Sequence, residues 1–231
     1  MKILLKKKPI NPIIIEGFPG FGLIGTIVTE FLIEHLKCEL IGEFLYDDLP
    51  AMIAIHNGVL VKPMAVHYSK KYNIIILQTI LNPKGKEWDI ADAIVEMAHK
   101  VDAKKIISIE GVASQTASKT GDTRLFYYGD DKLKKLGLDP IKESIVVGVT
   151  SSVMLRADNS VCIFAETHSA LPDSQAASKV IEVLDKYLDL KVDPKPLLKQ
   201  AKDFEDKLKN IMQQTSKTVD EHEKKYMSYL G

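Results

Sequence analysis

The sequence predicts an α/β fold with a mostly parallel sheet, a short antiparallel insertion and a helical C-terminal extension. Short apolar runs rich in Ile and Val alternate with longer segments of helical periodicity, as in parallel sheets covered by helices. Hydrophobic residues make up 45% and charged residues 27% of the 231-residue chain, as in ordinary globular domains. A chain of this length closes its own core, so we expect an α/β domain over residues 1–193 and a helix and tail over residues 194–231.

Strands are expected in the first half where short β-branched runs end at glycine, proline or asparagine. In chain order these runs cover residues 12–16, 39–46, 52–56, 59–61 and 73–81. Asn57-Gly58 joins the third run to the fourth, and this dipeptide is typical of a two-residue hairpin turn. After the first run, a glycine-rich turn leads into apolar residues at helical spacing over residues 23–36. The chain therefore opens as strand, turn and helix.

The second half continues the alternation of strands and helices. Further strands are expected over residues 105–110, 145–149 and 160–165. Helices are expected over residues 90–101, 130–136 and 173–188, with a turn or short helix over 151–155. Asp89 is a candidate N-cap for the first of these helices. The polar stretch 114–124 is typical of a functional or mobile loop.

The C-terminal segment differs from the rest of the chain. Pro194 and Pro196 mark a boundary, and a long helix is expected to begin at Leu197. Its apolar positions alternate steps of four and three, which is a heptad seam. These positions are Leu197, Ala201, Phe204, Leu208 and Ile211. Such a helix packs on its own domain, on a neighbouring subunit or on a partner protein.

Composition excludes several classes of function. Lys+Arg and Asp+Glu both total 31, so the net charge is zero and offers no general attraction to nucleic acid or to an anionic membrane. Only Arg124 and Arg156 are arginines, which argues against a site built on several bidentate phosphate clamps. Cys38 and Cys162 lie far apart and outside any ligand motif, as in a reduced cytoplasmic protein. We expect a cytoplasmic protein without cofactor, nucleic-acid partner or membrane segment.

The turn after the first strand matches the dinucleotide-binding pattern GxGxxG. Its special residues are Gly17, Pro19, Gly20, Gly22 and Gly25. Glu43 falls near the distance expected of a ribose-binding acid. However, Phe18 and Phe21 crowd the place of a pyrophosphate. A tight turn that uses glycine for close packing of strand and helix is the competing interpretation, and we expect this structural role.

Three acids, Glu16, Glu110 and Glu166, each follow an expected buried strand. Because the carboxyl ends of parallel strands share one edge, these acids could gather there and hold a metal or perform acid–base chemistry. The alternative is that polar residues simply end strands as they leave the core. His168 follows Glu166, but no Gly-x-Ser-x-Gly motif surrounds the loop serines, which argues against a Ser–His hydrolase.

Three stretches together resemble one family. They are residues 16–25 (EGFPGFGLIG), the Glu110-Gly111 pair and residues 165–177 (AETHSALPDSQAA). The combination resembles the archaeal branch of the proteasome assembly chaperone family, over roughly residues 10–205. This resemblance implies a three-layer α/β sandwich like that of nucleoside phosphorylases. It also implies self-association into a homo-oligomer and work as a binding protein instead of a catalyst.

The resemblance also bears on the C-terminal tail. Some archaeal members are linked to the proteasome core particle through a terminal hydrophobic–tyrosine–any motif. Here the chain ends Ser228-Tyr229-Leu230-Gly231, so the tyrosine is third from the end where the motif has it second. A family member whose tail recruits another protein fits equally well. We expect partner binding through Tyr226, Tyr229, Leu230 and Gly231, and we keep a small-molecule enzyme and a nucleotide-binding regulator as alternatives.

Overall fold

The computed structural model describes residues 1–47, 53–56, 59–79, 84–113, 123–167, 170–199 and 206. The strands are β1 (Lys2–Leu5), β2 (Ile13–Glu16), β3 (Glu39–Leu45), β4 (Ala54–His56), β5 (Val59–Val61), β6 (Met64–Ser69), β7 (Ile74–Thr79), β8 (Lys105–Ala113), β9 (Leu125–Tyr128), β10 (Asp139–Pro140) and β11 (Ser160–Thr167). The helices are η1 (Phe21–Leu23), α1 (Ile24–His35), α2 (Glu87–Lys100), η2 (Leu133–Leu136), α4 (Val149–Arg156), α5 (Ser174–Leu188) and α6 (Lys195–Lys199).

Nine of the strands form one sheet in the order β1-β3-β6-β7-β2-β8-β11-β9-β10. The four central strands, β7, β2, β8 and β11, are parallel to one another. The wing made of β1, β3 and β6 is antiparallel, and so is the pair of β9 with β11. The parallel centre confirms the α/β class expected from the sequence.

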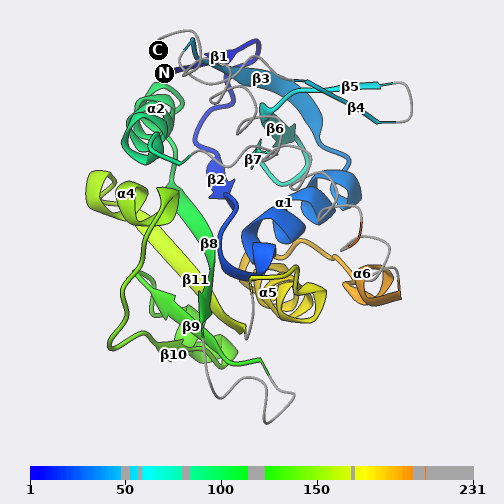
Figure 1. Ribbon diagram of the computed structural model, residues 1–231, viewed down its shortest axis with the longest axis vertical. Coiled ribbons are helices and arrows are strands. Elements are labelled where there is room, and N and C mark those ends of the chain that lie inside the picture. The colour runs from blue at the N-terminus through cyan, green and yellow to red at the C-terminus, as the bar shows by residue number, and fades with distance from the viewer. Residues whose placement is uncertain are drawn as a thin grey trace, which may run out of the picture.

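Helices cover both faces of the sheet and give three layers (Figure 1). Successive residues of β2 point to opposite faces, so Ile15 packs in the cluster under α1 and α5 while Ile14 packs in the cluster under α2 and α4. Both isoleucines are fully buried. A strand buried on both faces has no polar alternation, which explains why it appears in the sequence as an unbroken apolar run.

The helix boundaries follow local hydrogen bonds. At the start of α5, the Asp173 carboxylate accepts a hydrogen bond from the Ala176 N–H at 2.9 Å, the N-cap geometry expected for this residue type. The expected cap of α2 is wrong, because this helix begins earlier and Lys86 is its N-cap. There the Glu87 carboxylate accepts from the Gly85 N–H at 3.0 Å, so Asp89 lies within the first turn.

The strand expected over residues 145–149 is also wrong. The segment before α4 has no regular secondary structure, and the side chains of Ile145 and Val147 are 91% and 74% exposed. Val149 is instead the first residue of α4. The place beside β11 is occupied by β9. The sequence pattern did not predict β9, and it did not predict β1 or β6. The β-branched run thus has local strand propensity but no neighbour with which to pair.

The expected hairpin of β4 and β5 is confirmed and forms a two-stranded sheet of its own. Its Asn57-Gly58 turn lies outside the described residues. At the other end of the chain, α6 begins one residue after Pro194, and Leu197 is buried in the core beneath α1 and α5. The later seam positions and the terminal tyrosines lie outside the described residues. None of the helices in the described ranges combines the length and hydrophobicity that a membrane span needs.

We predict that Ile145→Ser and Val147→Ser each change the free energy of unfolding by less than about 0.5 kcal/mol, because both side chains are already in water. Ile163→Ala, in the fully buried strand β11, should cost about 2–5 kcal/mol. Urea denaturation of the three variants provides the measurement. A large loss in the Ile145 variant would show that this segment is packed after all.

Candidate functional site

Two of the three candidate acids meet at the carboxyl end of the parallel strands. Glu16 is the last residue of β2, and Glu110 lies on the neighbouring strand β8. Thr150, in the first turn of α4, lies between them. Its hydroxyl is 3.0 Å from Glu110 Oε2 and 3.5 Å from Glu16 Oε1. Because one hydroxyl carries one hydrogen, it donates to one carboxylate at a time.

Burial shapes the electrostatics of this acid pair. The side chain of Glu16 is completely buried, and burial raises its pKa from the usual 4.5 to about 7. Burial, with the charge of Glu16 as a second cause, raises the pKa of Glu110 to about 7 as well. Backbone N–H groups of Phe18 and Gly111 donate to Glu16 and Glu110 at 3.4 and 3.1 Å and oppose these rises. Near neutral pH the two coupled carboxyls therefore hold roughly one proton between them.

The third acid does not join the pair. Glu166 lies on β11 opposite Val112, two residues further along the sheet than Glu110, which is opposite Phe164. Two residues of strand correspond to roughly 6–7 Å. Glu166 is buried, and its backbone N–H donates to the Arg124 carbonyl at 3.0 Å. Thus β8 and β11 both continue past the acids that were expected to end them.

The glycine turn closes tightly over this edge of the sheet. A Cβ atom on Gly20 would lie 2.0 Å from Glu110 Oε1, so the backbone of the turn rests directly on this carboxylate. At the base of the turn, a Cβ on Gly17 would lie 2.3 Å from the carbonyl oxygen of Gly25. A side chain at Gly20 would push the turn away from β8. A side chain at Gly17 would push the end of β2 away from α1. The geometry supports the structural role proposed for the turn.

The turn is also joined to the start of α5. Gly22 has a left-handed backbone (φ +66°), and its carbonyl accepts a hydrogen bond from the Asp173 N–H at 2.9 Å. The Asp173 carboxylate in turn accepts from the Thr167 hydroxyl at 2.8 Å. A Cβ on Gly22 would lie 3.0 Å from the Thr167 methyl group. The separate sequence stretches that carry the family resemblance therefore meet at one place in the fold.

This arrangement suits structural closure better than catalysis. A bound phosphate would approach Glu110 directly beneath Gly20, and carboxylates there disfavour an anion. Glu43 on β3, the possible ribose-binding acid, forms an ion pair with Lys62 instead. The buried thiol of Cys162 has a pKa raised by burial and by the nearby carboxyls, so it is a poor nucleophile. Within the described residues, no three His, Cys, Asp or Glu side chains converge to hold a metal.

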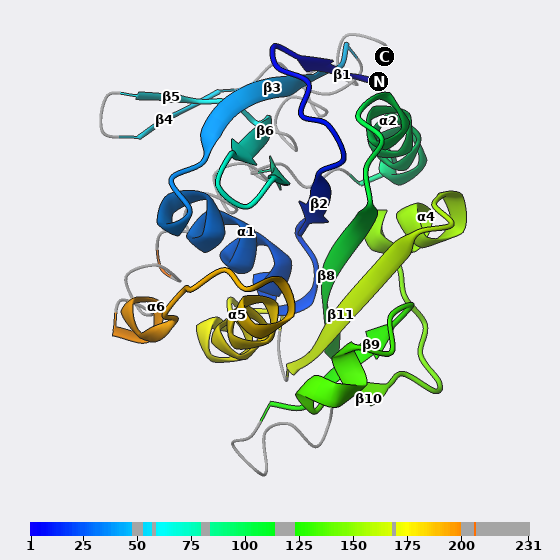
Figure 2. The same cartoon turned by 180° about the vertical axis from the view of Figure 1, so that it is seen from behind.

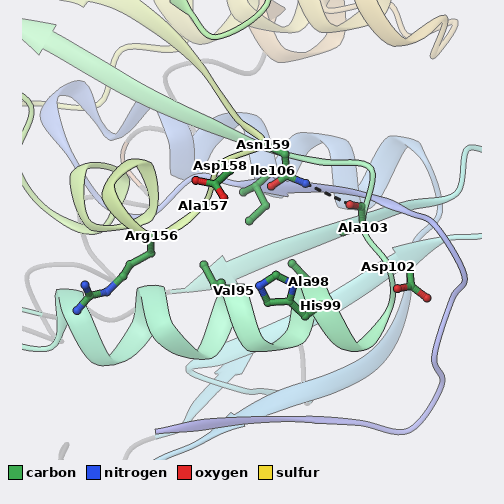
Figure 3. A pocket seen from close by; sticks show the side chains of 10 residues that line it. All are labelled: Val95, Ala98, His99, Asp102, Ala103, Ile106, Arg156, Ala157, Asp158 and Asn159. Carbon is green, nitrogen blue, oxygen red and sulfur yellow. Dashed lines mark hydrogen bonds between the residues drawn. The ribbon is translucent and has the colours of Figure 1, made fainter.

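Cavities are found at other places on the molecule. One of about 380 Å³ opens where α2 and α4 end, beside the start of β8 (Figure 3). His99 and Asp102 lie along it, whereas the Arg156 guanidinium turns away and donates to Asp92 at 2.8 Å. Another of about 370 Å³ lies by the C-terminal ends of α1 and α5. Neither is lined by the acid pair or the glycine turn.

Sequence reasoning identified Glu16, Glu110 and the glycines of this site but missed Thr150. This threonine lies between the strand expected over residues 145–149 and the turn or short helix expected over 151–155, with no local pattern that points to the sheet edge. His168 and the tail residues Tyr226, Tyr229, Leu230 and Gly231 lie outside the described residues.

Comparisons with known proteins were made for the sequence and for the fold. The profile of the PAC2 family matches residues 14–212. A structure of Pyrococcus furiosus PbaA, an archaeal homolog of proteasome-assembly chaperone, is 31% identical, covering 94% of this chain and 98% of its own, with a TM-score of 0.83. Pyrococcus furiosus PbaB, an archaeal proteasome activator, is 22% identical, covering 91% of this chain and 98% of its own, with a TM-score of 0.73. The uncharacterized protein MJ0106 of Methanocaldococcus jannaschii is 27% identical, covering 95% of this chain and 93% of its own.

The acid pair predicts an unusual pH dependence of stability. The pKa values of both glutamates are higher in the folded protein than the usual 4.5, so the folded state binds more protons between about pH 4.5 and pH 7. Their contribution is fully present below pH 4.5 and is lost as the pH rises to about 7. We expect Glu16→Gln to reduce this decline by removing the share of Glu16 and its charge on Glu110, while the share due to the burial of Glu110 remains. Urea denaturation from pH 4.5 to 8 provides the measurement.

The difference between wild type and variant isolates the acid pair from other groups that titrate in this range, including His67, whose pKa burial lowers. The exposed Glu96→Gln, on α2, is the matched control and should leave the decline in place. If the free energy of unfolding falls with pH equally in wild type and Glu16→Gln, the raised pKa of Glu16 is contradicted.

Gly22→Ala should destabilise the protein by about 1–3 kcal/mol, because alanine must adopt φ +66° while its methyl group presses on Thr167. Gly137→Ala is the matched control, since Gly137 is also left-handed (φ +92°) but has open space around it. The Gly22 variant should lose more stability than this control in thermal or urea denaturation. Equal losses would mean that the contact with Thr167 carries no energy.

Proposed function

This chain belongs to the PAC2 family, in the archaeal branch of the proteasome assembly chaperones, and on that premise we propose that it is a non-enzymatic chaperone-like protein. It self-associates and binds partner proteins through its C-terminal helix or tail. The partner is the proteasome core particle or another protein recruited by the tail. The similarity to PbaA over almost the whole of both chains supports a role of this kind.

The observation that carries the proposal is the closed carboxyl edge of the sheet. In open α/β enzymes this edge holds the ligand, because loops there leave a crevice. Here the backbone of the glycine turn lies on Glu110, while Thr150 occupies the space between the two acids. Both acids accept hydrogen bonds from backbone amides, and the Thr150 hydroxyl lies within reach of both. These carboxylate oxygens are therefore bonded to the protein itself.

The tail is the proposed partner-binding segment. Leu197 anchors the start of α6 in the core, so the chain beyond it begins from a fixed point on the domain. The terminal residues Tyr226, Tyr229, Leu230 and Gly231 supply aromatic and aliphatic side chains of the kind that dominate binding at protein interfaces. We place the protein in the cytoplasm, in keeping with the two free cysteines.

The enzyme and nucleotide-binding alternatives make a different prediction about ligands. A ligand at a hundred times its Kd adds about 2.7 kcal/mol to stability. We expect neither NAD nor ATP, nor a divalent metal ion, to raise the melting temperature of the protein. A clear shift with a dinucleotide that is lost in Gly20→Ala would favour the nucleotide-binding regulator, and metal binding lost in Glu110→Gln would favour an enzyme.

Deletion of residues 216–231 should leave the domain folded and abolish partner capture. This segment is rich in polar residues, with few large apolar side chains to bury. Pull-downs from cells of the source organism, followed by native mass spectrometry, measure capture, while circular dichroism and melting temperature report the fold.

A full-length variant with both Tyr226 and Tyr229 changed to Ser provides the control for tail length. It should lose capture as the deletion does if the aromatic side chains are the recognised groups. Unchanged capture by the deleted protein would move the partner-binding surface onto the α/β domain.

A further inference from the structure

The cavity of about 370 Å³ by the ends of α1 and α5 has three lysines around it, and we call it the lysine pocket. Lys37 follows α1, Lys71 lies in the turn between β6 and β7, and Lys191 follows α5. All three residues are exposed. Helices α1 and α5 lie together on one face of the sheet, with α6 beside α5 (Figure 2).

The lysine pocket carries an excess of positive charge. Within the part of the chain that the structure describes, no acid forms an ion pair with Lys37, Lys71 or Lys191. Asp193 also lines the pocket, and its Oδ1 accepts a hydrogen bond from the Lys195 N–H at 3.0 Å. Three ammonium groups beside one carboxylate attract an anionic group.

Lys37 occupies a position that favours glycine. Its N–H donates to the Glu34 carbonyl at 3.1 Å, and the next N–H, of Cys38, donates to the carbonyl of residue 33 at 2.9 Å. These two bonds close α1 in a Schellman motif, whose left-handed residue is usually glycine. Here that residue is Lys37, with φ +50°. Because the bonds already satisfy the carbonyls at the end of α1, closing the helix does not require a lysine side chain.

Hydrogen bonds fix the wall of the pocket that follows α5. The Asp185 carbonyl accepts from the Leu190 N–H at 3.1 Å, and the Asp185 carboxylate accepts from the Val192 N–H at 2.7 Å. In the turn between β6 and β7, Lys71 Nζ lies 4.7 Å from the centre of the Tyr72 ring. A pocket that is already ordered loses little conformational entropy when it binds a ligand.

The inner part of the pocket is apolar. Leu36 and Leu190 are buried, and Tyr72 and Val192 are partly buried against the same core. An apolar centre with a polar and charged rim is the usual arrangement of a protein–protein interface. A peptide segment that places a Glu or Asp side chain next to an apolar one would match both the rim and the centre.

We propose that the lysine pocket binds an acidic segment, flanked by apolar side chains, of the partner protein that the tail recruits. Pro196 lines the pocket and belongs to α6, so the helix that leads toward the tail begins beside it. A partner held by the tail therefore reaches the pocket at a high effective concentration, and a weak contact there is sufficient. This inference rests on the partner binding proposed above and adds a second contact to it.

Fluorescence polarisation with a free peptide tests the pocket separately from the tail. The probe is a fluorescein-labelled peptide that repeats Glu-Leu-Glu-Gly three times, and its neutral counterpart has Gln in place of Glu. The full-length protein should bind the acidic probe and not the neutral one, with an affinity that falls as the salt concentration rises. The full-length variant with Tyr226→Ser and Tyr229→Ser should bind the probe as the wild type does. No binding of the acidic probe, equal binding of both probes, or loss of binding in the tyrosine variant would overturn the proposal.

The pocket variant combines Lys37→Gly, Lys71→Gln and Lys191→Asn. It should weaken probe binding by on the order of 10-fold, because each exposed charge pair contributes little alone. Glycine and asparagine suit the left-handed backbone of Lys37 and Lys191 (φ +50° and +55°), so the melting temperature should not fall. Wild-type affinity in this variant would contradict the assignment of the pocket.

The charge-matched control changes three other exposed lysines, in the region of η2 and β10, to Gln: Lys132, Lys134 and Lys142. It loses the same net charge as the pocket variant and should bind the probe as the wild type does. Equal losses in the two variants would mean that net charge alone attracts the probe, and the proposal would then be wrong. If the probe does not bind but deletion of the tail still abolishes partner capture, the function of the tail stands and only the pocket is wrong.

Discussion

The close approach of the glycine turn to strand β8 is the constraint on which the carboxyl edge of the sheet depends. With Gly20 resting on the Glu110 carboxylate and Gly22 accepting from Asp173, the turn ties together β2, α1, β8 and α5. Leu23, the next residue, also has a left-handed backbone (φ +49°) without being glycine. A strained backbone conformation persists only where contacts with the surrounding structure hold it in place. Here the contacts come from β2, α1, β8 and α5.

This closure has an electrostatic consequence. Glu16 is fully buried and Glu110 partly buried beneath the turn, and ionisation of both would place like charges together in a poorly solvated site. A retained proton and the hydrogen bonds from Thr150 and from backbone amides reduce this repulsion. In a glycosidase or a metal-dependent hydrolase, a raised carboxyl pKa serves a substrate in an open cleft. Here the same shift accompanies acids bonded to Thr150 and to backbone amides under a tight turn, so a perturbed pKa is not by itself evidence of catalysis.

Local sequence signals predicted the parallel centre of the sheet and the outer strand β3, but missed the marginal strands β1, β6, β9 and β10. The Ile-rich runs of β2 and β7 are buried on both faces, so their strand character is visible without knowledge of their neighbours. By contrast, β6 combines His67 and Tyr68 with smaller residues, and β9 is only four residues long. Residues 145–147 show the opposite failure, since β-branched composition predicts a strand only where a pairing neighbour is free.

The candidate site, like the sheet, was predictable only in part from the sequence. The rule that parallel strands share a carboxyl edge brought Glu16 and Glu110 to one place, and the structure agrees. The rule could not give the register between β8 and β11, which places Glu166 two residues beyond the position opposite Glu110. That register depends on how far each strand continues past the edge of the sheet. Nor could the rule give Thr150, whose position follows from the packing of α4 against α2 and β8.

The scarcity of arginine in this chain bears on the partner binding proposed above. Interface hot spots are commonly Trp, Tyr or Arg, but this chain has two arginines, and both make contacts within the domain. The Arg156 guanidinium lies 4.7 Å from the centre of the Trp88 ring and bonds to Asp92, which joins α4 to α2. The Arg124 guanidinium lies over the Phe126 ring at 5.0 Å. Lysine is a flexible and strongly hydrated cation, poorly suited to the centre of an interface. We therefore expect the proposed association to depend on aliphatic and aromatic side chains, of which Leu4, Leu40 and Leu45 are about half exposed on the outer strands β1 and β3.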